Sequence, residues 1–234
     1  AGLPDPRAAK RAGDAFFSAA ARQRDWSDEM ARKKLAAAHA PYLSALGHLL
    51  ASITAQTGAR AFIDSSKVPE MAFALDCLDG VKMHLLHLQR DPRAVACSWH
   101  RKTGSYRRTL RNVRIWGRRQ ARLEGWASAL GERYRALHYE SFAAAPRPAI
   151  SAVMAWAGLP AAEVFTDDSH AYIDWSGQHL FPPVNESVLK ARRADVAITP
   201  ADGWRASRNR ALHWLALAGT WPRARRYFRN APRV

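Results

Sequence analysis

The chain of 234 residues has the length of one α/β domain with a small appendage, and its 48% of hydrophobic residues suffices for a sizeable core. The formal net charge of +16 comes mostly from 29 arginines beside 7 lysines, which favours anionic partners. Two separated cysteines, Cys77 and Cys97, exclude a disulfide framework and a cysteine-rich zinc site. With no signal-peptide pattern and no apolar run of membrane-spanning length, the sequence predicts a cytoplasmic protein.

Predicted helices and strands alternate along the chain. Helical spacing of apolar residues predicts helices over 27–57, 69–78, 92–102, 115–132 and 148–156, and a last one within 208–220. Short apolar runs predict strands at 60–64, 81–88 and 134–139, whereas 104–114 is predicted as a basic connection and 166–206 lacks periodicity. This alternation is typical of a parallel sheet covered by helices on both faces, so we expect an α/β fold with three α/β/α layers.

The stretch from Val81 to Trp99 predicts a buried strand, a short turn and a helix. Four apolar residues, Met83, Leu85, Leu86 and Leu88, are expected to make an inner strand covered on both faces. Asp91 is the expected N-cap of the helix, with Pro92 at its first position. Arg90 then lies at the carboxyl end of a strand and Ser98 two turns into the helix. Such strand ends bind ligands and helix N-termini attract anions, which predicts a phosphate site.

A second polar turn, from Asp64 to Lys67, also follows a predicted strand and precedes a helix. Both turns are expected to open on the same edge of the sheet, so that Lys67, Ser65, Ser66 and Arg90 surround one anion-binding crevice. The alternative interpretation is that Asp91 only caps its helix and Arg90 pairs with a nearby carboxylate.

These two segments resemble a known family. F-I-D-S-S-K-V-P at 62–69 and H-L-Q-R-D-P-R-A-V-A-C-S-W at 87–99 resemble sulfotransferases that use 3′-phosphoadenosine 5′-phosphosulfate, especially the bacterial branch. Y-R-A-L-H-Y-E-S-F at 134–142, the Gly-Leu-Pro at 158–160 and I-T-P-A-D-G-W-R at 198–205 resemble further parts of that family. The resemblance implies a fold like that of P-loop nucleoside triphosphate hydrolases. It also implies one domain over 1–234, with an α/β core at 26–160 and a loop-rich segment with a terminal helix at 161–234.

The resemblance also implies the roles of individual residues. Arg90 and Ser98 are expected to bind the 3′-phosphate of the cofactor, and Lys67 to stabilise the leaving group at its sulfuryl end. Further cofactor contacts are expected from Ser65, Ser66, Arg192 and Arg193. A general base should deprotonate the hydroxyl or amine of the acceptor. Asp64 and His84 are the first candidates for this base, and His87 and Glu70 are further candidates. No metal is required for this chemistry.

One departure from the family concerns its first strand and the loop that holds the 5′-phosphosulfate. Residues 1–25 contain no such strand or loop, so either the chain is truncated at its N-terminus or the protein has lost half of its cofactor site. We expect truncation, because the first residues resemble the interior of a sequence. The alternative function is a basic nucleic-acid- or nucleotide-binding protein without transferase activity, although most tryptophans lie at helical spacings that suggest a core rather than an open nucleic-acid surface. A kinase is disfavoured because no G-x-x-x-x-G-K-[ST] loop is present. The acceptor and the oligomeric state stay open.

Overall fold

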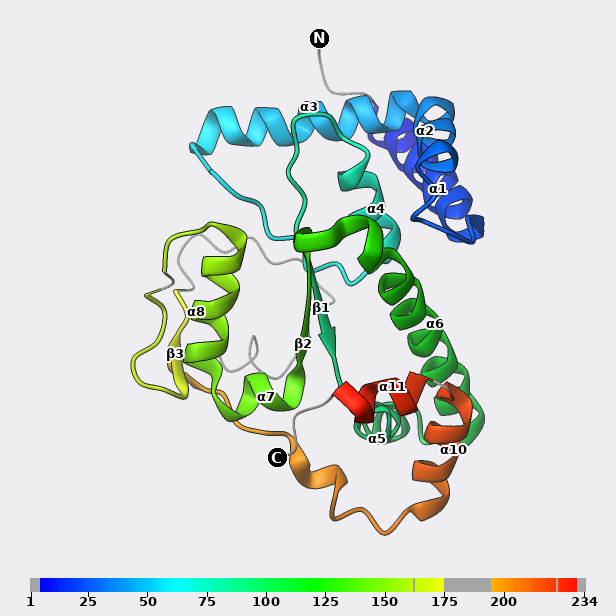
Figure 1. The fold of residues 1–234 in the computed structure, drawn as a ribbon, viewed down its shortest axis with the longest axis vertical. Coiled ribbons are helices and arrows are strands. Elements are labelled where there is room, and N and C mark those ends of the chain that lie inside the picture. The colour runs from blue at the N-terminus through cyan, green and yellow to red at the C-terminus, as the bar shows by residue number, and fades with distance from the viewer. Residues whose placement is uncertain (1–4, 162, 175–194, 222, 231–234) are drawn as a thin grey trace. The chain divides into compact units, whose positions relative to one another are not determined.

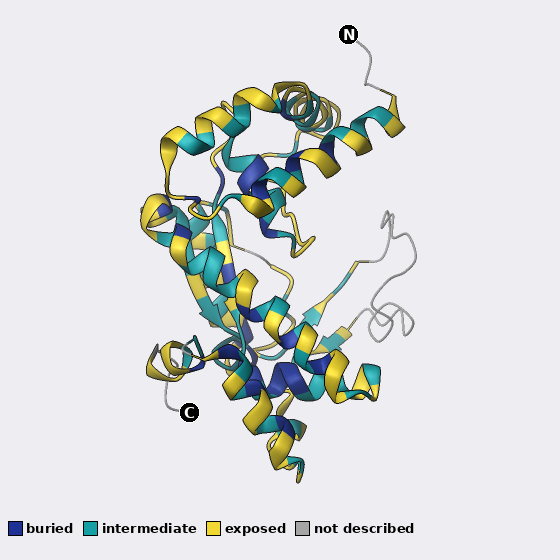
Figure 2. Ribbon diagram, turned by 90° about the vertical axis from the view of Figure 1, so that its right-hand side faces the viewer, coloured by how far each residue is buried: buried dark blue, intermediate teal, exposed yellow. Residues whose placement is uncertain are grey.

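The computed structural model describes residues 5–161, 163–174, 195–221 and 223–230 (Figure 1). These residues form two compact units, and each is described by itself. The first unit comprises Ala1–Leu86 and Arg118–Arg135, and the second comprises His87–Gly117 and Ala136–Val234. In both, several helices carry buried residues on one side and exposed residues on the other (Figure 2). None of the helices in the described ranges is both long and apolar enough to cross a bilayer.

The first unit is helical. Its elements are α1 (Pro6–Arg22), α2 (Glu29–Ala38), α3 (Ala40–Thr57), α4 (Pro69–Asp76), the C-terminal half of α6 (Tyr106–Leu130) and the 3-10 turn η1 (Gly131–Arg133). Three aromatic residues form the centre of its core: Trp26 stacks on Phe73 at 4.6 Å between ring centroids and meets the ring of Trp126 edge-on at 5.3 Å. Such pairs combine large buried areas with favourable ring geometry, so this cluster is the main source of the unit's packing energy.

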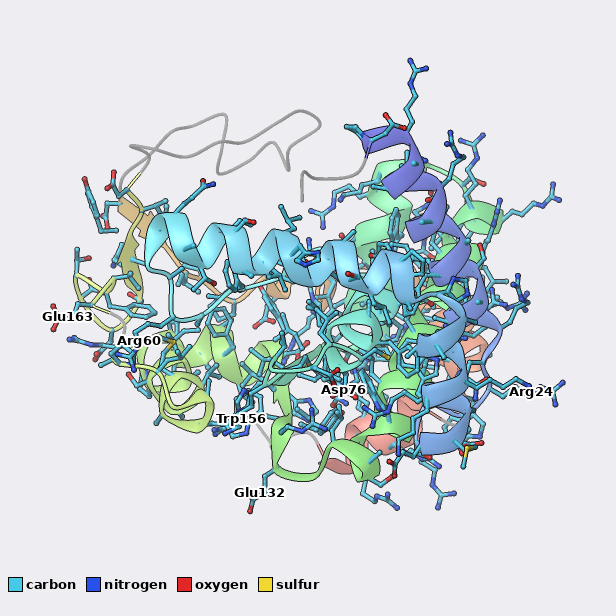
Figure 3. The ribbon with its side chains drawn as sticks, turned by 90° about the horizontal axis from the view of Figure 1, so that it is seen from above. Arg24, Arg60, Asp76, Glu132, Trp156 and Glu163 are labelled. Carbon is cyan, nitrogen blue, oxygen red and sulfur yellow. The ribbon has the colours of Figure 1, made fainter. Side chains whose placement is uncertain are left out.

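A second contact of this unit is ionic. The carboxylate of Asp76, at the end of α4, accepts from Nη1 of Arg32 at 2.9 Å and from Nη1 of Arg133 at 2.5 Å, and its side chain is only 5% exposed. Figure 3 shows Asp76 among other side chains, whereas Arg24 extends away from the ribbon. Because a carboxylate with two guanidinium partners is held from two directions, Asp76 ties α2 and η1 to α4.

The second unit holds the remaining helices. They are α5 (Pro92–Thr103), the N-terminal half of α6, α7 (Tyr139–Ala144), α8 (Pro146–Ala157), α10 (Arg210–Thr220) and α11 (Arg223–Asn230), with the 3-10 turn η2 (Asp202–Trp204). A small antiparallel sheet pairs β3 (His170–Tyr172) with β4 (Asp195–Ala197). The core contains Val95 and Ala96 of α5, Val113 of α6, and Leu212 and Ala216 of α10. Glycines allow α6 and α10 to approach closely, since a Cβ on Gly219 would lie 3.0 Å from Leu110 Cδ1.

The two longer strands, β1 (Leu85–Gln89) and β2 (Tyr134–His138), are neighbours in one sheet. Arg133, just before β2, donates from Nη1 to the carbonyl of Met83, just before β1, at 3.4 Å. At the other end, the backbone N–H of Asp91 donates to Oε1 of Glu140 at 3.0 Å. Because both contacts join like ends of the strands, β1 and β2 are parallel.

This architecture agrees with the predicted α/β class only in its coarse features. The described residues contain a two-stranded parallel sheet rather than the central sheet of a three-layer fold. The predicted strand at 60–64 is wrong, since those residues form no strand. The prediction of an inner strand with both faces covered is also wrong, because Leu86 and Leu88 are 37% and 49% exposed. An apolar run in the sequence indicates a buried strand, but whether both of its faces are covered depends on the helices and strands that pack against it.

Helix boundaries differ from the prediction at two places. The helix predicted over 27–57 is two helices that meet at His39, because Pro41 lacks an N–H and fits only the first turn of α3. The connection predicted at 104–114 is wrong. Gly104 ends α5 in the left-handed conformation with φ of 61°, and α6 begins two residues later at Tyr106. Arginine is a good helix former, so the basic run continues as helix.

The other predicted elements are confirmed within a few residues, including α4, α5, α8, α10 and β2. The helix α11, directly after α10, has no counterpart in the prediction.

Candidate functional site

Arg90 follows β1 and lies against the aromatic ring of Tyr139, the first residue of α7. Its guanidinium carbon is 4.4 Å from the ring centroid. Its Nε is fully buried and has no hydrogen-bond partner among the described residues. No ion pair joins Arg90 to a carboxylate of the described chain. A buried guanidinium N–H without an acceptor carries an energetic cost, which an anionic acceptor at this place would remove.

The neighbouring carboxylate of Asp91 has other partners. Asp91 caps α5, as predicted, by accepting from the backbone N–H of Arg93 at 2.8 Å. The same carboxylate accepts from Nε and Nη2 of Arg93 at 3.0 and 2.7 Å. These bonds to Asp91 raise the pKa of Arg93. The N-terminus of α5 is therefore occupied by a carboxylate of the chain itself, and the alternative, a pairing of Arg90 with a nearby carboxylate, is not seen among the described residues.

Arg93 is held further by two aromatic rings. Its guanidinium carbon lies 4.8 Å from the ring centroid of Trp204 and 5.0 Å from that of Phe228 in α11. Trp204 therefore packs against the start of α5. Arg93 is thereby fixed as a structural arginine, whereas Arg90 keeps its unpartnered Nε.

The carboxyl end of β2 contributes further polar groups that the sequence did not single out. The Nδ1 of His138 and the Oγ of Ser141 are buried without a hydrogen-bond partner in the described chain. The ring of His138 lies 5.0 Å from that of Tyr227, and burial lowers its pKa, so the ring is neutral near pH 7. His138 lies within the strand predicted at 134–139 and Ser141 follows two residues after it. Their position at a strand end was the only signal of a site, because their unpartnered state depends on packing.

Ser98 lies on α5, half-buried, two turns after Arg90. None of the hydrogen bonds found in the described chain involves its side chain, so the hydroxyl is available to a ligand. Arg192 and Arg193, predicted to reach the same phosphate, lie outside the described residues.

The second predicted turn, from Asp64 to Lys67, is exposed and belongs to the first unit. Asp64 accepts from the backbone N–H and the hydroxyl of Ser66, both at 2.9 Å, which closes the turn. Lys67 has a φ of 61°, and among the described residues it alone has a positive φ without being glycine. Its carbonyl accepts from Nη1 of Arg119 at 3.5 Å. A non-glycine residue in this conformation carries backbone strain of about 1–3 kcal/mol.

The named general bases differ in their surroundings. Glu70 pairs with Arg122 at 2.7 Å and is thus not a free carboxylate. His84 directly precedes β1, six residues before Arg90 in the sequence. Burial lowers the pKa of His84, and His87, within β1, is only 1% exposed. These observations do not single out a base among Glu70, His84 and His87.

A comparison with protein families completes this description. The family model described as "Sulfotransferase family" matches residues 3–163, which is well over half of the chain. The chain therefore belongs to the sulfotransferase family, as its sequence predicted. A search of curated proteins and one of solved structures give no significant match.

Proposed function

We propose that this chain transfers a sulfuryl group from 3′-phosphoadenosine 5′-phosphosulfate, and that Arg90 binds the 3′-phosphate of this donor. The observation that carries the proposal is the buried, unpartnered Nε of Arg90 at the carboxyl end of β1. A guanidinium presents its N–H groups in a planar fork that matches the oxygens of a phosphate. The ring of Tyr139 supports the other face of this fork and keeps its orientation.

Ser98 supplies the second contact in this proposal. A hydroxyl on α5 donates one hydrogen bond to a phosphate oxygen, and no residue of the described chain competes for it. The capping carboxylate of Asp91 repels an anion from the first turn of α5, which leaves Arg90 and Ser98 as the phosphate ligands in place of the helix N-terminus.

The donor, when bound, supplies an activated sulfuryl group that moves in line to an acceptor oxygen or nitrogen. The residues that act on it are expected to work by positioning and by neutralising charge on the leaving phosphate oxygen. Lys67 is the residue that we propose for this neutralisation, since its ammonium projects from a turn with a constrained backbone. Ser65 and Ser66 are proposed as further donors from the same turn. The general base is not assigned, because Asp64 is bonded to Ser66 and His84 lies at the amino end of β1.

The test compares the binding of adenosine 3′,5′-bisphosphate with that of 5′-AMP by calorimetry. The wild-type chain should prefer the bisphosphate, and Arg90→Ala should weaken the binding of the bisphosphate about 10- to 100-fold while leaving that of 5′-AMP unchanged. Arg101→Ala, an exposed arginine near the end of the same helix, is the matched control. Equal affinity of the wild type for both nucleotides would refute the proposed donor.

Nucleic-acid binding without transfer is the second candidate. It is favoured by the exposed arginines of α6, Arg107, Arg111 and Arg114, which share one helix face. In that case oligonucleotides should bind with a steep dependence on salt, and Arg90→Ala should not change their affinity.

A further inference from the structure

The helix α10 is apolar on both of its faces, which is unusual for a helix at the surface of a protein. Its inner face packs through Leu212 and Ala216. Its outer face carries five exposed residues that follow helical spacing and include no polar side chain: Ala211, Trp214, Leu215, Ala218 and Trp221. Trp214 is 72% exposed, Trp221 60% and Leu215 39%. We call these five residues the α10 apolar stripe. A surface helix normally presents a polar outer face, so the stripe indicates a partner surface.

Arginines flank the stripe on both sides. Arg210 begins α10, four residues before Trp214, and is exposed on the same side of the helix. On the other flank, Arg114 of α6 lies with its Cγ 3.9 Å from where a Cβ on Gly219 would stand. Arg107 and Arg111 continue the same face of α6 and are also exposed. The stripe is thus an apolar band with Arg210 on one side and three arginines of α6 on the other.

No acidic residue neutralises this charge within the segments that build the surface. The chain contains no Asp or Glu between Asp91 and Glu124, which covers α5 and the N-terminal half of α6. It also contains none after Asp202, which covers α10 and α11. Elsewhere, acidic residues are interspersed, as in the pairs Lys10–Asp14 and Lys33–Glu29. The charge of this surface therefore complements an extended anionic surface.

The combination of residues decides which anionic surface fits. Nucleic acids use aromatic rings for stacking, but an aliphatic side chain such as Leu215 between the rings gives no stacking surface. The interface of a bilayer accommodates both kinds of side chain, because tryptophan rings lie at the headgroup level while aliphatic groups reach the acyl boundary. Arginines at the same level attract anionic headgroups.

We propose that the α10 apolar stripe and its flanking arginines dock the protein onto an anionic lipid bilayer, with α10 parallel to the membrane surface. This docking does not depend on the proposed sulfuryl transfer, because it uses neither Arg90 nor Lys67. It places the reaction of the family close to a membrane surface.

The test measures binding of the full chain to vesicles of phosphatidylcholine alone and to vesicles with about a third phosphatidylglycerol. The wild-type protein should sediment with the anionic vesicles and not with the neutral ones, and its tryptophan fluorescence should shift to shorter wavelength on binding. Trp214→Gln combined with Trp221→Gln should weaken this binding about tenfold or more. Arg111→Gln combined with Arg114→Gln should do the same by removing two charges at the surface.

The matched control is Ile63→Gln, which removes an apolar side chain that is 85% exposed in the first unit. This variant should bind anionic vesicles as the wild type does. Circular dichroism of each variant confirms its folding, which is expected because the replaced side chains lie outside the core. The proposal is overturned if the wild type does not bind anionic vesicles or if the double tryptophan variant binds them fully. It is also overturned if that variant loses self-association or oligonucleotide binding while its vesicle binding is unchanged.

Discussion

The hydroxyl of Tyr227 donates a hydrogen bond of 2.6 Å to Oε2 of Glu140, a residue 87 positions earlier in the chain. The other oxygen of Glu140 accepts from the backbone N–H of Asp91 at 3.0 Å. One carboxylate therefore joins α11, the end of β2 and the turn that carries Arg90. Because both partners of Glu140 are half-buried or buried, their hydrogen bonds are shielded from competing water.

Replacing Tyr227 with phenylalanine tests this connection. We expect Tyr227→Phe to lower the free energy of unfolding by about 1–3 kcal/mol, since it leaves Oε2 of Glu140 without its donor. Urea denaturation followed by circular dichroism measures the change. Tyr172→Phe, at a side chain that is 53% exposed, is the control and should change the free energy by less than about 0.5 kcal/mol. Equal stability of Tyr227→Phe and wild type would contradict the role assigned to this bond.

Alkaline pH should destabilise the protein. Burial, and then the bond to Glu140, raise the pKa of Tyr227, and burial raises the pKa of Tyr134 to about 12. A raised tyrosine pKa means that folding favours the neutral phenol, so its stabilisation is complete below the unfolded value of about 10 and is lost as the pH rises above it. Cys77, whose pKa burial raises to about 11, adds to the loss from about pH 9.

Urea midpoints measured at a series of pH values check this expectation. The midpoint should fall with increasing pH above about 10, and the fall should be shallower in Tyr227→Phe because one contributing phenol is absent. Tyr172→Phe should follow the wild-type curve. A midpoint that stays constant up to pH 12 would show that these groups titrate alike in the folded and unfolded chain.

The carboxylate of Asp76 should contribute more to stability than an exposed carboxylate in an ion pair. Asp76→Asn keeps the size of the side chain but removes the charge that holds Arg32 and Arg133, so we expect a loss of about 2–3 kcal/mol. Asp14→Asn breaks an exposed pair with Lys10 and should cost less than about 0.5 kcal/mol. Chemical denaturation of both variants gives the comparison, and losses of equal size would contradict it.

Substitutions of Lys67 should change the stability and the activity of the protein separately. Glycine adopts a positive φ without strain, so Lys67→Gly should leave the free energy of unfolding unchanged or raise it by up to ~1 kcal/mol. If the ammonium stabilises the leaving oxygen, sulfuryl transfer should nevertheless fall by about a hundredfold or more. Lys67→Ala removes the ammonium and keeps the strain, so it should lose activity equally without the gain in stability. Retained transfer activity in both variants would exclude Lys67 from the reaction.

The sequence by itself determined those features that depend on neighbours along the chain. Asp91 with Pro92 defines the start of α5, Gly104 its end, and the apolar run before Arg90 defines a strand, because caps, turns and short-range patterns are local. The motifs around Arg90 and Lys67 also sufficed to assign the sulfotransferase family. Local patterns failed to predict burial that depends on other helices or strands packing against a residue, as for the exposed Leu86 and Leu88 of β1.

Only the tertiary structure decided which polar groups have partners. It assigns the carboxylate of Asp91 to Arg93 and places Tyr139 against Arg90, whose Nε keeps no partner in the described chain. It also exposes Trp214 and Trp221, although most tryptophans lie at helical spacings that suggest a core. For Arg90 and the two tryptophans the physical reason is the same: hydrogen bonding and burial depend on residues that are distant in sequence, and the order of residues along the chain does not specify these contacts.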